Sequence, residues 1–139
     1  CHTTSWGFST RSIGGLIMAH GDDDGMVMPP KLAPHQVAII PIIRDDGSAV
    51  IEHCQKLAAR LKAAGIRVHL DTTDSRSSDK MWAAIKRGVP LRVEIGQREM
   101  DDGQLTHIRR DLGKDSKTTV KTDEFIAGVQ GILDRMQSE

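Results

Sequence analysis

The feature that most constrains the fold is a strand–helix–strand order in the first half of the chain. Residues 37–43 form a short apolar run, which is typical of a strand buried on both faces. Apolar residues then recur at helical spacing from Val50 to Leu61, and Gly65 is placed to end that helix. A second apolar strand follows at residues 66–70. This order favours two parallel strands joined by a right-handed crossover.

The second half of the chain adds elements of the same kind. Residues 45–48 predict a turn before the first helix, with Ser48 as its candidate N-cap. The other predicted elements are a helix from Ser78 or Asp79 to about Gly88, a strand at 91–95 with one buried and one solvated face, strands at 104–110 and 117–121 around a turn at 111–114, and a last helix capped by Thr122 or Asp123. The fold class is therefore α/β, with a mixed sheet of about five strands and three main helices.

Residues 1–34 differ from the rest of the chain. They are rich in glycine and proline and contain one short apolar stretch, from Ile13 to Ala19, so they predict a strand, a short helix and turns. We interpret residues 1–34 as the remnant of another domain with a linker, and residues 35–139 as a complete domain. Because the first residue is Cys1 and not Met, we expect the chain to be a piece of a longer product.

Composition limits the kinds of site that this chain offers. Lys and Arg together number 19, as do Asp and Glu, so a nucleic-acid site has to be a local patch. No apolar run approaches the roughly 20 residues of a membrane span. Cys1 and Cys54 lie in no ligand pattern and are predicted to be reduced thiols of a cytoplasmic protein. The carboxylates within residues 20–25 are consecutive, so their side chains diverge, and no metal site is predicted.

Two stretches resemble one enzyme family. Residues 4–34 run from Thr-Ser-Trp-Gly-Phe-Ser-Thr-Arg through a glycine pair to a Pro-Pro step, and residues 86–99 read Lys-Arg-Gly-Val-Pro-Leu-Arg-Val-Glu-Ile-Gly-Gln-Arg-Glu. The first is similar to the third signature motif of class II aminoacyl-tRNA synthetases in its prolyl form, and the second to a strand of the anticodon-binding domain of prolyl-tRNA synthetases. Gln97 and Glu99 depart from the Pro and Asp that are usual in this family.

The resemblance implies an activity for a longer parent protein. The parent would be a homodimer that attaches proline to its tRNA using ATP and magnesium. This chain lacks the two earlier class II motifs, so it is expected to be inactive alone and to hold no cofactor. Arg11 would contact ATP phosphate, since its charge is fixed and its donors form a planar fork. Thr4, Ser5, Trp6 and Gly14 would line the pocket for proline and the adenylate.

The second stretch implies recognition of the anticodon of proline tRNA. Every proline anticodon contains two adjacent guanines, whose edges are exposed in a single-stranded loop. A carboxylate accepts hydrogen bonds from guanine N1 and N2, and arginine pairs with O6 and N7. Glu94, Arg98 and Arg109 are therefore the candidates for base recognition. The candidates for phosphate contacts are Lys86, Arg87, Arg92, Arg110, Lys114 and Lys117.

Two other functions stay open at this point. The chain could be a stand-alone tRNA-binding module without catalysis, or a protein-interaction module that keeps the fold without the RNA site. The polar residues of the sheet could equally form a solvated face with ordinary ion pairs. Trp82 stands at helical spacing from Ile85, and its position favours a place in the core over a role as a platform for base stacking.

Overall fold

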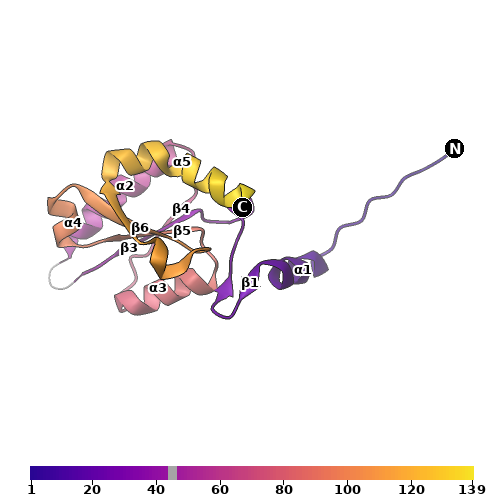
Figure 1. The fold of residues 1–139 in the computed structure, drawn as a ribbon, viewed down its shortest axis with the longest axis horizontal. Coiled ribbons are helices and arrows are strands. Elements are labelled where there is room, and N and C mark those ends of the chain that lie inside the picture. Colours follow the sequence, from indigo (N-terminus) through magenta and orange to yellow (C-terminus); the bar gives the residue numbers. More distant parts are fainter. Residues whose placement is uncertain (44–46) are drawn as a thin grey trace.

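The α/β prediction is confirmed by a computed structural model, which describes residues 1–43 and 47–139. A mixed sheet lies at the centre, with helices on both of its faces (Figure 1). Its strands, in spatial order, are β4 (Val68–Leu70), β3 (Val37–Pro41), β5 (Leu91–Ile95), β6 (Gln104–Arg109) and β7 (Thr118–Lys121). The first three strands are parallel, and β6 and β7 continue the sheet in antiparallel pairing.

The predicted crossover unit is present, with α2 (Ser48–Ala63) joining β3 to β4. Parallel pairing puts Val37 opposite Val68. The helix begins one residue earlier than predicted, because Gly47 takes the N-cap position and Ser48 is already helical. Asp45 and Asp46, which complete the predicted turn, lie outside the described residues.

Two layers of helices enclose the sheet. Helices α2 and α5 (Thr122–Ser138) cover one face, and α3 (Ser77–Lys86) covers the other (Figure 1). The larger core lies under α2 and α5 and contains Leu57, Leu61, Phe125 and Leu133 packed on the strands. The smaller core lies under α3, where alternate residues of β3 meet Ala84 and Val89. The strands at the centre of the sheet are therefore buried on both faces.

Several local predictions differ from the structure. A helix, α4 (Gln97–Asp101), follows β5 where none was predicted, and a 3-10 turn, η1 (Gly113–Ser116), occupies part of the predicted 111–114 turn. Helices α3 and α5 begin at Ser77 and Thr122, so their N-caps are Arg76 and Lys121. Strand β5 has no solvated face: the side chain of Glu94 is buried, because β5 is a central strand and α3 lies over that face.

The N-terminal segment projects from the domain (Figure 1). Residues 1–9 form no regular element, contrary to the predicted strand, and α1 (Arg11–His20) has no buried residue. A hairpin of β1 (Gly21–Asp22) and β2 (Gly25–Met26) then returns the chain to the domain, where β2 contacts α3. In the described part of the chain no helix is long and apolar enough to cross a membrane.

The linker after the hairpin is held by backbone and side-chain bonds to the domain. The guanidinium of Arg67 donates to the carbonyl oxygens of Pro30, Lys31 and Ala33, at 2.9, 3.2 and 2.9 Å. The side-chain amide of Gln36 donates to the oxygen of Pro30 at 3.2 Å. Residues 30–33 are therefore fastened to the start of β3 and β4.

Candidate nucleic-acid interface

A buried carboxylate stands on the face of the sheet that α3 covers. Glu94 lies on β5 opposite Thr106 of β6, and only 6% of its surface is exposed. Arg92, two residues earlier on the same face, donates from Nε to Glu94 Oε1 at 3.1 Å. Lys117 Nζ lies 3.5 Å from the other oxygen, Oε2. A carboxylate out of water needs such partners, because an unpaired buried charge is strongly destabilising.

The two cations beside Glu94 differ in solvent exposure. The side chain of Arg92 is 12% exposed and that of Lys117 is 59% exposed. Arg92 therefore fixes the orientation of the carboxylate, whereas Lys117 holds Oε2 loosely from the solvent side. A ligand with hydrogen-bond donors could replace Lys117 at Oε2 without moving Arg92. Guanine N1 and N2 are donors of the kind that a carboxylate accepts.

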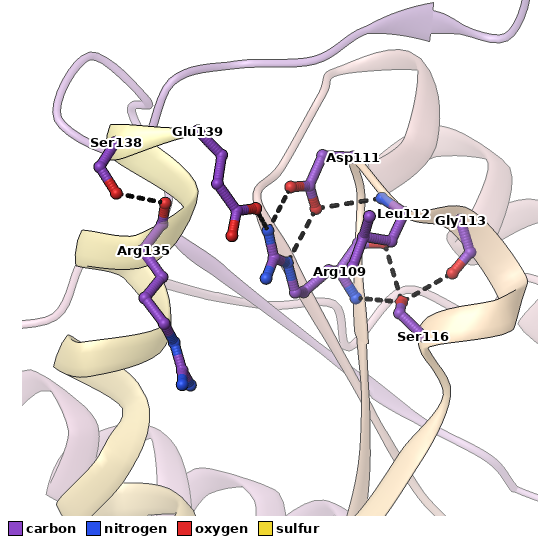
Figure 2. A network of polar contacts seen from close by, with 8 residues as sticks. All are labelled: Arg109, Asp111, Leu112, Gly113, Ser116, Arg135, Ser138 and Glu139. Atoms are coloured by element: carbon purple, nitrogen blue, oxygen red, sulfur yellow. Dashed lines mark hydrogen bonds and ion pairs between the residues drawn. The ribbon is translucent and has the colours of Figure 1, made fainter.

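The structure does not bring the other two anticodon candidates to Glu94. Arg98 lies on the exposed surface of α4, beyond the end of β5. Arg109 points to the opposite face of the sheet from its neighbour Ile108, toward the C-terminal end of α5 (Figure 2). The three residues therefore form no single constellation, and the role in base recognition that the sequence suggests for them stays a prediction.

Arg109 is bound to acidic partners within the domain. Its Nε donates to Asp111 Oδ1 at 3.0 Å, and one terminal nitrogen donates to both Asp111 and Glu139 (Figure 2). The hydrogen bond with Asp111 is the main cause that raises the pKa of Arg109 above its already high ordinary value. Its backbone N–H also donates to Ser116 Oγ at 3.0 Å, which ties β6 to η1. Arg109 thus joins β6, η1 and the end of α5.

Arg110, a predicted phosphate contact, holds the N-terminal hairpin. Its two terminal nitrogens donate to the two oxygens of Asp22 at 2.8 and 2.6 Å, and Nε donates to the carbonyl oxygen of Ile85 at 3.1 Å. Hydrogen bonding by Arg110 is the largest cause that lowers the pKa of Asp22 to about 2. The Arg110 side chain is only 8% exposed, so its donors are enclosed by β1 and α3.

The other predicted phosphate contacts lie on the surface around α3 and η1. Lys86 and Arg87 are exposed at the C-terminal end of α3, and Lys114 is exposed on η1. A hollow of about 640 Å³ separates the two elements. Its lining includes the cations Arg92, Arg109, Arg110 and Lys114 and the exposed ring of Trp82. Of these exposed cations Lys114 lines the hollow, whereas Lys86 and Arg87 lie outside its lining.

Two residues of α3, Trp82 and Lys80, lie where the sequence did not place them. Trp82, predicted as a core residue, is 49% exposed; that prediction is wrong, because Lys80 and Ala84 are the α3 residues that face inward. Lys80 is 5% exposed, and its Nζ donates to the carbonyl oxygen of Asp71 at 3.4 Å. A buried lysine within a helix gives no signal in sequence, since lysine on a helix ordinarily marks its solvated face.

The residues predicted to line the proline and adenylate pocket are not assembled. Thr4, Ser5 and Trp6 lie along the extended segment before α1, and Trp6 is 96% exposed. Arg11 begins α1 and is exposed, and a Cβ added at Gly14 would meet nothing within 4 Å. Among the described residues no three His, Cys, Asp or Glu side chains could hold a metal ion together.

Comparison with known proteins identifies the domain. Residues 36–132 match the sequence model of the family described as "Anticodon binding domain". The chain is also 44% identical to a proline–tRNA ligase of Sphingopyxis alaskensis and 45% identical to proline–tRNA ligase 2 of Rhodococcus jostii, in each case over 99% of its length. A proline–tRNA ligase of Bdellovibrio bacteriovorus is 46% identical over 97% of the chain.

The chain spans only part of these relatives. It covers 28% of the Sphingopyxis and Bdellovibrio proteins and 29% of the Rhodococcus protein. The resemblance to prolyl-tRNA synthetases that the sequence motifs carry is nevertheless confirmed, because it extends over nearly the whole chain. Since the family model matches more than half of its residues, the chain belongs to the anticodon binding domain family, in a form homologous to that of proline–tRNA ligases.

Proposed function

We propose that this chain recognises the anticodon of proline tRNA as part of a proline–tRNA ligase. The observation that carries the proposal is the buried Glu94, whose Oε1 accepts a hydrogen bond from Arg92 and whose Oε2 lies 3.5 Å from the exposed ammonium group of Lys117. This carboxylate would accept hydrogen bonds from N1 and N2 of a guanine, while Lys117 moves toward O6 or a neighbouring phosphate. Membership in the anticodon binding domain family and the ligase relatives support the same function.

The parent enzyme would attach proline to its tRNA using ATP and magnesium, as a cytoplasmic homodimer. In that parent, Arg11 would contact ATP phosphate and Thr4, Ser5, Trp6 and Gly14 would complete the pocket for proline. These residues do not form the pocket by themselves, so the rest of the catalytic domain must supply it. The isolated chain is accordingly expected to bind RNA and to have no ligase activity.

A double-mutant cycle tests this proposal by combining a substitution at Glu94 with a substitution of the anticodon guanines and measuring the affinity of each chain for each RNA. The probe is a 17-nucleotide RNA hairpin with a proline anticodon loop, compared with the same hairpin carrying inosine, which lacks the N2 amino group, in place of both anticodon guanines. Glu94→Gln keeps the shape of the side chain and removes its charge. We expect inosine to weaken binding to the unchanged chain about tenfold, roughly 1.4 kcal/mol, and to have little effect on the Glu94→Gln chain.

A matched variant separates recognition from general charge. Glu52 is an exposed carboxylate that pairs with Lys56 at 2.8 Å on α2, which covers the opposite face of the sheet from Glu94. Glu52→Gln therefore changes the net charge equally at a site away from the candidate interface. This variant should discriminate inosine as the unchanged chain does. Thermal melting must show that Glu94→Gln is folded. Equal discrimination by the Glu94→Gln and Glu52→Gln chains would refute the role of Glu94.

A further inference from the structure

Trp82 occupies an unusual place for a large apolar side chain. It lies on α3 with 49% of its surface exposed, between two concave regions of the domain. The first is the hollow of about 640 Å³ that Trp82 lines together with Arg92 and Lys114. The second has a volume of about 600 Å³ and is lined by Asp79, Trp82, Ala83 and Lys86. The indole ring therefore forms a ridge with a lysine on either side.

The surroundings of the ring combine apolar and cationic groups. Met81 and Ile85 of α3 line the first hollow beside Trp82, and Leu112, which is 55% exposed, lies across it. Within the described residues neither Lys86 nor Lys114 has an ion-pair partner. A single exposed apolar residue is ordinary, but an aromatic ring flanked by unpaired cations has the character of a binding surface.

From this arrangement we propose that Trp82 is a stacking platform for an unpaired RNA base, with Lys86 and Lys114 contacting the phosphates on its two sides. An indole offers a flat face to any base, and cations track the backbone, which is the combination that binds single strands. The proposal rests on the proposed function, because the RNA loop that Glu94 reads would supply the base. Arg92 connects the two places, since it orients Glu94 and also lines the hollow beside Trp82.

Charge favours a stacked base over attraction to phosphate alone. Three of the four cations in the first hollow already have acidic partners, and Asp24 and Asp115 also line it. The positive electrostatic potential of this surface is therefore moderate, and attraction to phosphate provides only part of the binding. The flat face of Trp82 then contributes a share of the affinity that salt does not remove.

Fluorescence tests the stacking directly, because the chain has only two tryptophans. Trp6→Phe leaves Trp82 as the only tryptophan, and titration with the 17-nucleotide proline hairpin should quench its emission. Trp82→Phe leaves Trp6, which is 96% exposed on the N-terminal segment, and its emission should not change. Emission from Trp82 that stays constant while the hairpin binds would overturn the proposal.

Affinity provides the second test, and it separates this proposal from the function on which it rests. Trp82→Ala should weaken binding of the hairpin about tenfold, roughly 1.4 kcal/mol, Trp82→Tyr should restore most of the affinity, and Trp6→Ala should have no effect. Preference for guanine over inosine should survive in Trp82→Ala, since Glu94 is unchanged.

Each combination of results decides between the two proposals. Retained guanine preference with equal affinities for the Trp82→Ala and unchanged chains would remove the platform and leave the anticodon function standing. Quenching of Trp82 by the hairpin and by an unstructured eight-nucleotide RNA, without guanine preference, would leave the platform and remove the anticodon function. If neither RNA binds the chain and neither RNA quenches the emission of Trp82, both proposals are wrong.

Discussion

Three arginines near the candidate interface are bound to acidic partners within the chain. Arg92, Arg109 and Arg110 each bind at least one carboxylate, and their side chains are 12%, 14% and 8% exposed. Asp111 and Asp22 each accept from two nitrogens of their arginine, which is the forked geometry that arginine provides best, whereas Glu94 accepts from Arg92 Nε alone. As a result, these three arginines add little free positive charge near the candidate interface, where Lys86, Arg87 and Lys114 are exposed cations.

The two cysteines should differ sharply in reactivity. Burial raises the pKa of the Cys54 thiol to about 11, whereas Cys1 is exposed. Because the thiolate is the reactive form, a disulfide reagent at pH 8 should titrate one thiol of the folded chain rapidly and the second only after denaturant is added. A Cys1→Ser variant should show no rapid phase. Two rapid thiols in the unchanged chain would contradict the burial of Cys54.

The histidine His107 should make stability depend on pH. Its ring lies 5.3 Å from that of Phe125, its Nδ1 atom is buried without a hydrogen-bond partner, and burial lowers its pKa. The unfolded chain therefore takes up a proton first as the pH falls below about 6.5, and stability is lost from there downward. The pKa of His35 is also lowered, first by burial and then by neighbouring cations, and it adds to the same loss.

Denaturant unfolding at pH 7.5 and pH 5 measures this effect. The difference in the free energy of unfolding between the two pH values should be smaller in His107→Leu than in the unchanged chain. His2→Leu, at an exposed position, serves as the control and should leave the difference intact. If His107→Leu and the unchanged chain lose the same free energy on acidification, His107 does not titrate as the structure implies.

At the scale of elements, the contact between the hairpin and α3 depends on close backbone packing. Gly88 follows α3 with φ +69°, and a Cβ atom there would lie 2.5 Å from the carbonyl oxygen of Met26. Gly65, which follows α2, has a similar φ of +83°, but a Cβ there would meet nothing within 4 Å. Both glycines adopt the left-handed region of backbone conformation, which favours glycine. Only at Gly88 would a side chain also clash with a neighbouring segment.

These two glycines form a matched pair for a stability measurement. Gly65→Ala should lower the free energy of unfolding by about 1 kcal/mol, which is the backbone strain alone. Gly88→Ala should lower it by roughly 2–3 kcal/mol, because the strain is joined by the clash with β2. Equal losses in the two variants, measured by denaturant unfolding, would show that the hairpin does not pack against α3 as described.

Much of the element order followed from local patterns. The apolar run of β3 and the helical spacing of α2 are periodic over enough residues to specify both elements. Helix α4 was missed because its five residues contain no apolar period. Trp82 was misplaced because its spacing from Ile85 suggested an inward stripe. At about 100° per residue, it lies roughly 200° from both Lys80 and Ala84, the positions that face the sheet.

The site was harder to predict than the fold. Glu94 could be selected from its motif, but its partner Lys117 lies between η1 and β7, and no sequence pattern pairs the two. Arg109 and Arg110 are adjacent but bind different partners, Asp111 and Glu139 in one case and Asp22 in the other, so residue type alone could not separate them. The partner of Arg110 is Asp22, which is 88 residues away and in another segment. Such distant pairs are set by tertiary structure.

For the whole molecule, the N-terminal segment should behave differently from the domain. Ile13, Ile17 and Met18 of α1 are 57%, 50% and 84% exposed, and an isolated helix of 10 residues is marginal in water. We therefore expect the amides of residues 1–20 to exchange rapidly in a monomer and to be protected only where another molecule covers α1. Strong protection of this segment in a sample shown to be monomeric would contradict this account.

The formal net charge of the molecule is zero, so attraction to RNA as a whole should be weak and recognition has to come from the local site. This is the central claim, and it sets base recognition against general attraction to phosphate. Salt dependence distinguishes the two, because phosphate contacts weaken steeply with salt and base contacts much less.

The most direct measurement is titration of the chain with proline tRNA at two salt concentrations, beside the same tRNA with both anticodon guanines replaced by other bases. The account predicts that the natural tRNA binds at least tenfold more tightly at both concentrations, about 1.4 kcal/mol of base recognition. Equal affinities that fall together as salt is raised would contradict it, because only phosphate attraction would then remain.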